Sequence, residues 1–148
     1  MILKLLFSIK NLYPDWGLLV IRLGIGLSMM TLHGYGKLTA GPEMWTKLGG
    51  QMPSFGIDFL PVFWGFMAMF SEFFASLLII LGLFFRPAAL LLVFTMMVAA
   101  ITHLNMPAGS ERAGISGASH ALEFMIVFLG LYFTGPGKFS ISSLWKMN

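Results

Sequence analysis

The fold is decided by FLPVFWGFMAMFSEFFASLLIILGLFFRPAALLLVFTMMVAAITHL, residues 59–104. Apolar side chains run through this stretch almost without interruption, and its only acidic or basic residues, apart from one histidine, are Glu72 and Arg86. A membrane-spanning helix needs about 20 predominantly apolar residues, so the stretch is long enough for two. A break is expected at Arg86-Pro87, because proline suits the first turn of a new helix. We therefore expect a helical hairpin whose spans cover residues 59–85 and 87–104.

Two further apolar runs flank this hairpin, at residues 17–35 and 118–134. The second run ends at the Gly-Pro-Gly sequence of residues 135–137, which is typical of a helix stop. Of the 148 residues 57% are hydrophobic and 10% are charged, whereas about a quarter of an ordinary soluble domain is charged. The sequence therefore predicts an all-α fold, a four-transmembrane-helix antiparallel bundle that forms one domain over residues 1–148.

Three other segments complete the expected layout. Met1 to Tyr13 alternates apolar residues with lysines, which is typical of a short amphipathic helix at the membrane interface. Residues 36–58 and 105–117 are expected to be loops on the side opposite the termini. The first loop contains Trp45 and Met52 among glycines and prolines, so we expect it to dip into the interface or cap the bundle.

The basic residues predict the orientation of the bundle. Because the number of spans is even, both termini lie on one side of the membrane. That side carries Lys4, Lys10, Arg86, Lys138 and Lys146, and the other carries Lys37, Lys47 and Arg112. The excess of positive charge predicts that the termini are cytoplasmic.

The composition also excludes several classes of function. The chain has no cysteine, so it has no disulfide, no iron–sulfur ligation and no thiolate metal site. Its net charge of +3 comes from scattered Lys and Arg residues, which gives no indication of nucleic-acid binding. Membrane lipids are the expected surroundings, and any redox chemistry must use a bound group.

Three charged residues fall inside the expected spans: Arg22, Glu72 and Glu123. A charge in hydrocarbon costs about 3 kcal/mol or more unless it is paired or hydrated, so these side chains should face the bundle interior. Arg22 and Glu72 both lie roughly 16 to 20 Å from the outer surface at 1.5 Å per residue. We expect them to form a buried ion pair, which either lines a catalytic pocket or only fixes helix register. Arg22 has a further alternative, which is to extend toward the cytoplasmic interface.

Three histidines, His33, His103 and His120, fall near the outer ends of the spans. Each alone is typical of interfacial hydrogen bonding, but three at one level also fit a ligand-binding site. Two of them would be enough for a bis-histidine haem, and His120 with Glu123 and His103 would be enough for a metal ion. Neither pattern has a diagnostic spacing, so no metal site is predicted and haem is not favoured.

The order of these motifs resembles that of the DoxX family. The resemblance rests on Arg22-Leu-Gly24, His33-Gly34-x-x-Lys37-Leu38, Ser71-Glu72, Leu78-Ile-Ile-Leu-Gly82, Arg86, Glu123 and the Gly135-Pro136-Gly137-Lys138 segment. It implies a four-helix protein of the bacterial inner membrane that is associated with redox enzymes. It also implies that Arg22, His33, Lys37, Glu72 and Glu123 line a polar interior. The chain departs from the thiosulfate-oxidising branch of the family because it is a single short unit.

The leading hypothesis is a membrane subunit that binds a quinone or another lipophilic ligand in a pocket open to the outer side. Glu72, Glu123 and Arg22 are the candidate catalytic residues, because carboxylates relay protons and a guanidinium stabilises an oxyanion. His33, Lys37, His103 and His120 are the candidate ligand-binding residues. One alternative is a cofactor-free membrane enzyme that acts on a lipid or isoprenoid. The other is a non-enzymatic partner, scaffold or small-solute transporter, and a homo-oligomer or a redox-enzyme partner is compatible with each hypothesis.

Overall fold

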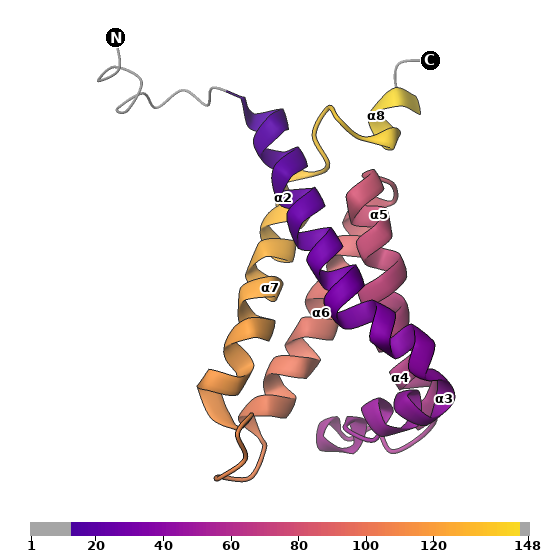
Figure 1. Ribbon diagram of the computed structural model, residues 1–148, viewed down its shortest axis with the longest axis vertical. Helices are drawn as coiled ribbons and strands as arrows, with labels where there is room; N and C mark the ends of the chain where they lie inside the picture. Colours follow the sequence, from indigo (N-terminus) through magenta and orange to yellow (C-terminus); the bar gives the residue numbers. More distant parts are fainter. Residues whose placement is uncertain (1–12, 146–148) are drawn as a thin grey trace, which may run out of the picture.

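The computed structural model describes residues 13–145, and the regular elements in this range are all helices. Four helical segments are long and apolar enough to cross a membrane: Pro14–Gly49, Pro61–Leu81, Phe85–Leu104 and Gly114–Thr134. They run alternately up and down as a bundle (Figure 1). The predicted four-span helical fold is therefore confirmed. The amphipathic helix expected over Met1 to Tyr13 lies outside the described residues, apart from Tyr13 itself.

The first span is much longer than the predicted 17–35. It consists of α2 (Pro14–Ser28), a π-helical segment η1 (Met29–Gly34) and α3 (Tyr35–Gly49). A kink at Gly41, where φ is +72°, turns the end of α3 sideways. Glycine adopts this conformation without strain, and the proline that follows it disfavours a straight helix. Most of the expected loop over 36–58 is therefore helical, including the 3₁₀ turn η2 (Met52–Phe55).

The second span is also interrupted by π-helix. It consists of α4 (Pro61–Phe70), η3 (Ser71–Ala75) and α5 (Ser76–Leu81). Gly82, with φ of +67°, ends it, and the chain turns through Phe84 into α6 (Phe85–Leu104). The turn thus comes before Arg86-Pro87, which lies in the first turn of α6.

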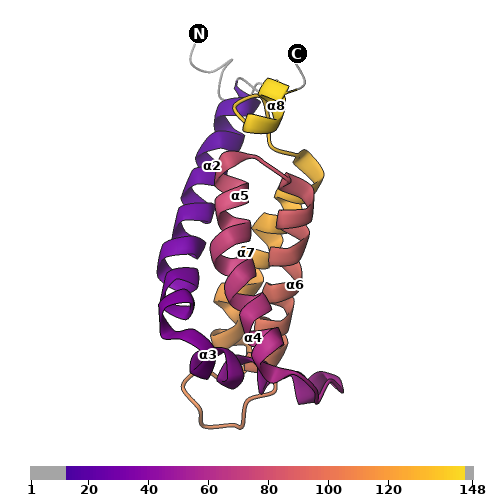
Figure 2. The ribbon, with the colours of Figure 1, turned by 90° about the vertical axis from the view of Figure 1, so that its right-hand side faces the viewer.

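The fourth span, α7 (Gly114–Thr134), begins earlier than predicted and ends at Gly135 as predicted. A short helix, α8 (Ile141–Trp145), follows it. The start of α2, the α5–α6 turn and α8 all lie at one end of the bundle, which we call the terminal end (Figures 1 and 2). The opposite end, formed by α3, η2 and the connection between α6 and α7, is called the loop end.

Close approaches between helices hold the site in place. The two π-helical segments pack against each other, and α3 packs along α4. A Cβ atom on Gly49 would lie 1.7 Å from the carbonyl oxygen of Pro61, and one on Gly65 would lie 1.8 Å from that of Trp45. The backbones of α3 and α4 therefore touch, in the way that small residues permit in membrane helices.

Candidate functional site

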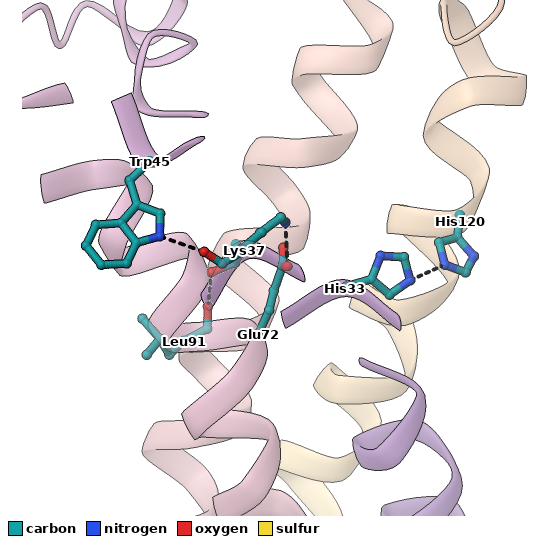
Figure 3. A network of polar contacts seen from close by, with 7 residues as sticks. His33, Lys37, Trp45, Glu72, Leu91 and His120 are labelled. Carbon is teal, nitrogen blue, oxygen red and sulfur yellow. Dashed lines mark hydrogen bonds and ion pairs between the residues drawn. The ribbon is translucent and has the colours of Figure 1, made fainter. Parts of the chain in front are cut away.

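The central polar feature of the bundle is an ion pair between Lys37 on α3 and Glu72 on η3. The Lys37 ammonium donates a hydrogen bond to the Glu72 carboxylate (Figure 3). The Glu72 side chain is 4% exposed and that of Lys37 is 24% exposed. Because Glu72 lies near the middle of the second span, the pair is inside the part of the bundle that spans the membrane. Each charge therefore depends on the other for its stability there.

Local backbone structure brings these two residues together. Both π-helical segments lie at the point of contact, and π-helical turns are often found at functional sites. The backbone of Glu72 packs directly against the Cα atom of Gly34 on η1. Trp45, which follows the kink in α3, donates a hydrogen bond of 2.9 Å from Nε1 to the carbonyl oxygen of Lys37. The kinked end of α3 thus returns to fix the segment that carries the lysine.

A cavity of about 480 Å³ opens beside the ion pair, between α3, α4 and α6. This volume lies within the range of about 300–1,000 Å³ that is typical of small-molecule sites. Among residues 13–145, Lys37 and Glu72 are the only charged residues that line it. The remaining lining residues are mostly apolar and include Leu48 and Met52 of the predicted capping segment, as well as Met67, Trp64, Phe94 and Val98.

The cavity has a mouth on the side of the bundle. Phe63 on α4 and Phe94 on α6 both line it, yet they are 48% and 53% exposed. Since both residues belong to membrane-spanning helices, these rings face the surroundings of the bundle at the level of the lipid. The rim of the cavity thus lies on the side of the bundle, where Phe63 and Phe94 are exposed.

His33 and His120 form a second polar contact. His33 on η1 and His120 on α7 approach with 3.0 Å between their Nε2 atoms, and Phe124 packs its edge against both rings. In Figure 3, His33 points toward α7 and away from the Lys37–Glu72 pair. The histidine pair therefore lies on a different side of the first span from the cavity.

The other predicted site residues are not part of either contact. His103 contacts the carbonyl oxygen of Arg112 through Nδ1, at 2.9 Å, and is not joined to the other two histidines. Glu123 is exposed on α7, so the expectation that it faces the interior is wrong. Within residues 13–145, no three His, Asp or Glu side chains gather in a way that would hold a metal ion. The alternative of a metal site at His103, His120 and Glu123 therefore has no support.

The predicted ion pair between Arg22 and Glu72 is wrong. The Arg22 side chain is 1% exposed, and its guanidinium group donates to main-chain carbonyl oxygens. These acceptors are Ile79 at 3.1 Å and Ile80 at 2.8 Å on α5, with Phe139 at 2.9 Å and Pro136 in the segment after α7. Carbonyl groups at the C-terminal ends of helices carry partial negative charge, so they stabilise a buried cation. Arg22 thus joins three parts of the terminal end.

Sequence reasoning identified both members of the true pair but not their pairing. Lys37 was assigned to an outer loop because the first span was expected to end at residue 35. The apolar cavity residues of α3 and η2 were recognised only as a capping segment. The helical pattern of the first span is weak beyond residue 35, because Gly34, Gly36 and Gly41 are poor helix formers.

Four helices that can cross a membrane, with an ion pair and a buried arginine between them, define a multi-pass membrane protein with a polar interior. The chain belongs to the DoxX family: the family model described as DoxX matches residues 17–105, which is more than half of its length. The matched region contains Arg22, His33, Lys37 and Glu72 but ends before His120 and Glu123. A search of curated proteins and a search of solved structures each gave no match.

Proposed function

We propose that this DoxX protein binds a lipophilic molecule with a polar head group, of the quinone type, in the cavity between α3, α4 and α6. The observation that carries the proposal is that a single ion pair, Lys37–Glu72, provides the charged groups of a cavity whose other described lining residues are mostly apolar. Such a site orients a ligand through its head group, while the apolar walls bind its hydrocarbon part.

The chemistry of the pair fits a quinone. The Lys37 ammonium can donate a hydrogen bond to a quinone carbonyl oxygen, and it stabilises the negative charge that develops there on reduction. Reduction of a quinone to a quinol takes two electrons and two protons, one proton for each oxygen. The Lys37 ammonium can pass one proton to the nearer oxygen and Glu72 can relay its replacement, while the proton for the farther oxygen comes from outside this pair. The electrons come from a redox enzyme that acts as the partner, as the DoxX association with such enzymes supports.

The membrane setting of the proposal follows from the same features. We place the protein in the bacterial inner membrane as one domain, with cytoplasmic termini, on the basis of its family and its charge distribution. The cavity then lies in the outer half of the bilayer, close to the loop end. Its lateral mouth between Phe63 and Phe94 gives access from the lipid, where quinones are dissolved.

Tryptophan fluorescence provides a direct test of binding. Trp64 lines the cavity, and a bound quinone quenches a neighbouring indole. Protein in lipid nanodiscs is titrated with a short-chain ubiquinone or menaquinone analogue, and saturable quenching is expected. The same titration of Trp64→Phe should show much weaker quenching. Mass spectrometry of the lipids extracted from the purified protein identifies any native ligand.

Variants of the ion pair connect binding to the site. Lys37→Met is expected to weaken quinone binding at least tenfold. Lys138→Met is the matched control, because Lys138 pairs with Asp15 at the exposed terminal end, with 3.8 Å between nitrogen and oxygen. The double variant Lys37→Met/Glu72→Leu leaves no charge unpaired, so it should fold and still fail to bind. Unchanged quinone affinity in the folded double variant would contradict the proposal.

A second candidate function rests on the aromatic walls of the cavity. Trp64, Phe63 and Phe94 surround a space that also holds a carboxylate, and aromatic faces stabilise cations. This combination suits a cofactor-free enzyme that protonates an isoprenoid or sterol-like lipid. Recovery of such a lipid instead of a quinone from the purified protein would favour this candidate.

A further inference from the structure

The position of Glu123 is unexpected for a helix surrounded by lipid. The residue is exposed on α7, nine residues after the helix begins at Gly114, which is about 14 Å along the helix axis. The buried face of α7, with Phe124, Phe128 and Leu131, points the other way. Among residues 13–145, no side chain or backbone group forms a hydrogen bond or ion pair with its carboxylate. Because α7 is long and apolar enough to cross a membrane, a carboxylate within it is stabilised by a partner.

Small and polar residues are mixed with apolar ones on the exposed face around Glu123. Ser116, Glu123, Ile126, Gly130 and Phe133 are exposed and follow the spacing of one side of a helix, with the half-buried Ser119 at its edge. Three of these are small residues, and a Cβ atom on Gly130 would have nothing within 4 Å. Small and polar residues in a membrane helix are typical of a surface on which another helix packs.

A second copy of the chain provides the partner that Glu123 lacks. His120 is exposed one turn before Glu123 on the same helix, and its Nε2 atom contacts His33. Its Nδ1 atom has no partner among the described residues, so it is able to donate a hydrogen bond. Two cations of the spans are already engaged, because Arg22 binds carbonyl oxygens and Lys37 pairs with Glu72.

Symmetry makes this arrangement self-complementary. Two copies with the same topology are related by a twofold axis along the membrane normal, so their α7 helices run parallel. Each Glu123 then lies one helical turn from His120 of the second copy. We propose that the protein forms a homodimer through the exposed face of α7, in which each Glu123 carboxylate binds His120 of the other copy. This interface is separate from the cavity, so its failure would leave the proposed function untouched.

Cysteine cross-linking tests the interface in native membranes. The chain has no cysteine, so a single introduced thiol reports on one position. Ser119→Cys and Gly130→Cys are expected to give a disulfide-linked dimer on mild oxidation, seen on a non-reducing gel. Phe74→Cys is the control, because Phe74 is 38% exposed on η3, which belongs to the second span between α4 and α5, on the opposite side of Figure 1 from α7. Equal cross-linking at all three positions, or none at 119 and 130, would overturn the proposal.

Three further variants separate the roles of shape and charge. Gly130→Leu adds a side chain into open space, so the monomer should fold while the dimer is lost. Glu123→Leu should weaken dimerisation about tenfold in a nanodisc or detergent dilution series, whereas Glu123→Gln, which still accepts a hydrogen bond, should weaken it less. Dimerisation that survives Glu123→Leu unchanged would show that the carboxylate has another partner and would refute the Glu123–His120 pairing.

Discussion

Gly34 packs directly against the backbone of Glu72. A Cβ atom at position 34 would lie 2.7 Å from both the carbonyl carbon and the carbonyl oxygen of Glu72. This contact joins the two π-helical segments and sets the distance from which Lys37, three residues later, reaches the carboxylate. The central ion pair therefore depends on a residue without a side chain.

The first prediction concerns this contact. Gly34→Ala should destabilise the bundle by about 1 to 3 kcal/mol, because a methyl group cannot fit against main-chain atoms that belong to a helix. Gly36→Ala is the matched control, since nothing lies within 4 Å of its Cβ position, and alanine there should be neutral or slightly stabilising. Thermal unfolding in a mild detergent measures both. Equal midpoints for the two variants would contradict the close packing of the π-helical segments.

The second prediction is a double-mutant cycle on Lys37 and Glu72. Lys37→Met or Glu72→Leu alone should be strongly destabilising, because each leaves one charge unpaired inside the bundle. The double variant should be more stable than the sum of the two changes by more than about 1 kcal/mol. Denaturation in mixed micelles gives the three free energies of unfolding. Strict additivity would mean that the two side chains do not interact.

The third prediction distinguishes a structural Arg22 from a catalytic one. Arg22→Lys should lower stability by about 3 kcal/mol or more, since an ammonium group cannot reach four carbonyl acceptors that a planar guanidinium fits. Arg86→Lys should have little effect, because Arg86 is exposed. The measurement is the unfolding midpoint, followed by quinone affinity below that midpoint. Normal stability with lost quinone binding would instead place Arg22 at the ligand.

The fourth prediction connects the α3–α4 contact to the cavity. Gly65→Ala should displace the kinked end of α3, because the new methyl group would overlap the carbonyl oxygen of Trp45. Leu48 and Met52, which line the cavity beyond this contact, would move with it, so quinone affinity should fall. Gly130→Ala, on the open face of α7, serves as the control. Retained affinity in Gly65→Ala would mean that the cap does not shape the site.

The fifth prediction tests the orientation of the bundle. Single cysteines at Glu111, at the loop end, and at Arg86, at the terminal end, are treated in intact cells with a maleimide that does not cross membranes. Glu111→Cys should react at once, and Arg86→Cys only after the membrane is permeabilised, if the terminal end is cytoplasmic. The reverse pattern would invert the topology.

The four spans were predictable because a run of about 20 apolar residues has few alternatives to a membrane helix. The first span was placed too short because glycine and proline lower helix propensity locally, yet packing of α3 along α4 overrides that preference. The kink at Gly41 accommodates Pro42 without ending the helical segment. Lys37 therefore remained an outer-loop residue in the sequence interpretation, while the structure has it inside.

The pairing of the charged residues was harder to predict from the sequence than the four spans. Arg22 and Glu72 are the deepest charges in the sequence, and simple counting along straight helices puts them at one level. Two π-helical segments change the rotation of the helices, and the acceptors of Arg22 are main-chain carbonyl groups that no residue pattern reveals. Which residues form the polar contacts of the bundle was thus partly predictable, but which atoms meet was not.

The bonds of Arg22 also have a consequence for how the chain is made. Arg22 belongs to the first span to leave the ribosome, whereas Pro136 and Phe139 follow the fourth. Until that last segment is synthesised, the guanidinium group lacks two of its acceptors, at a membrane depth where an unsatisfied charge is costly. The bundle is therefore complete only once the segment after α7 has been made, because that segment completes the coordination of Arg22 on the first of the four spans.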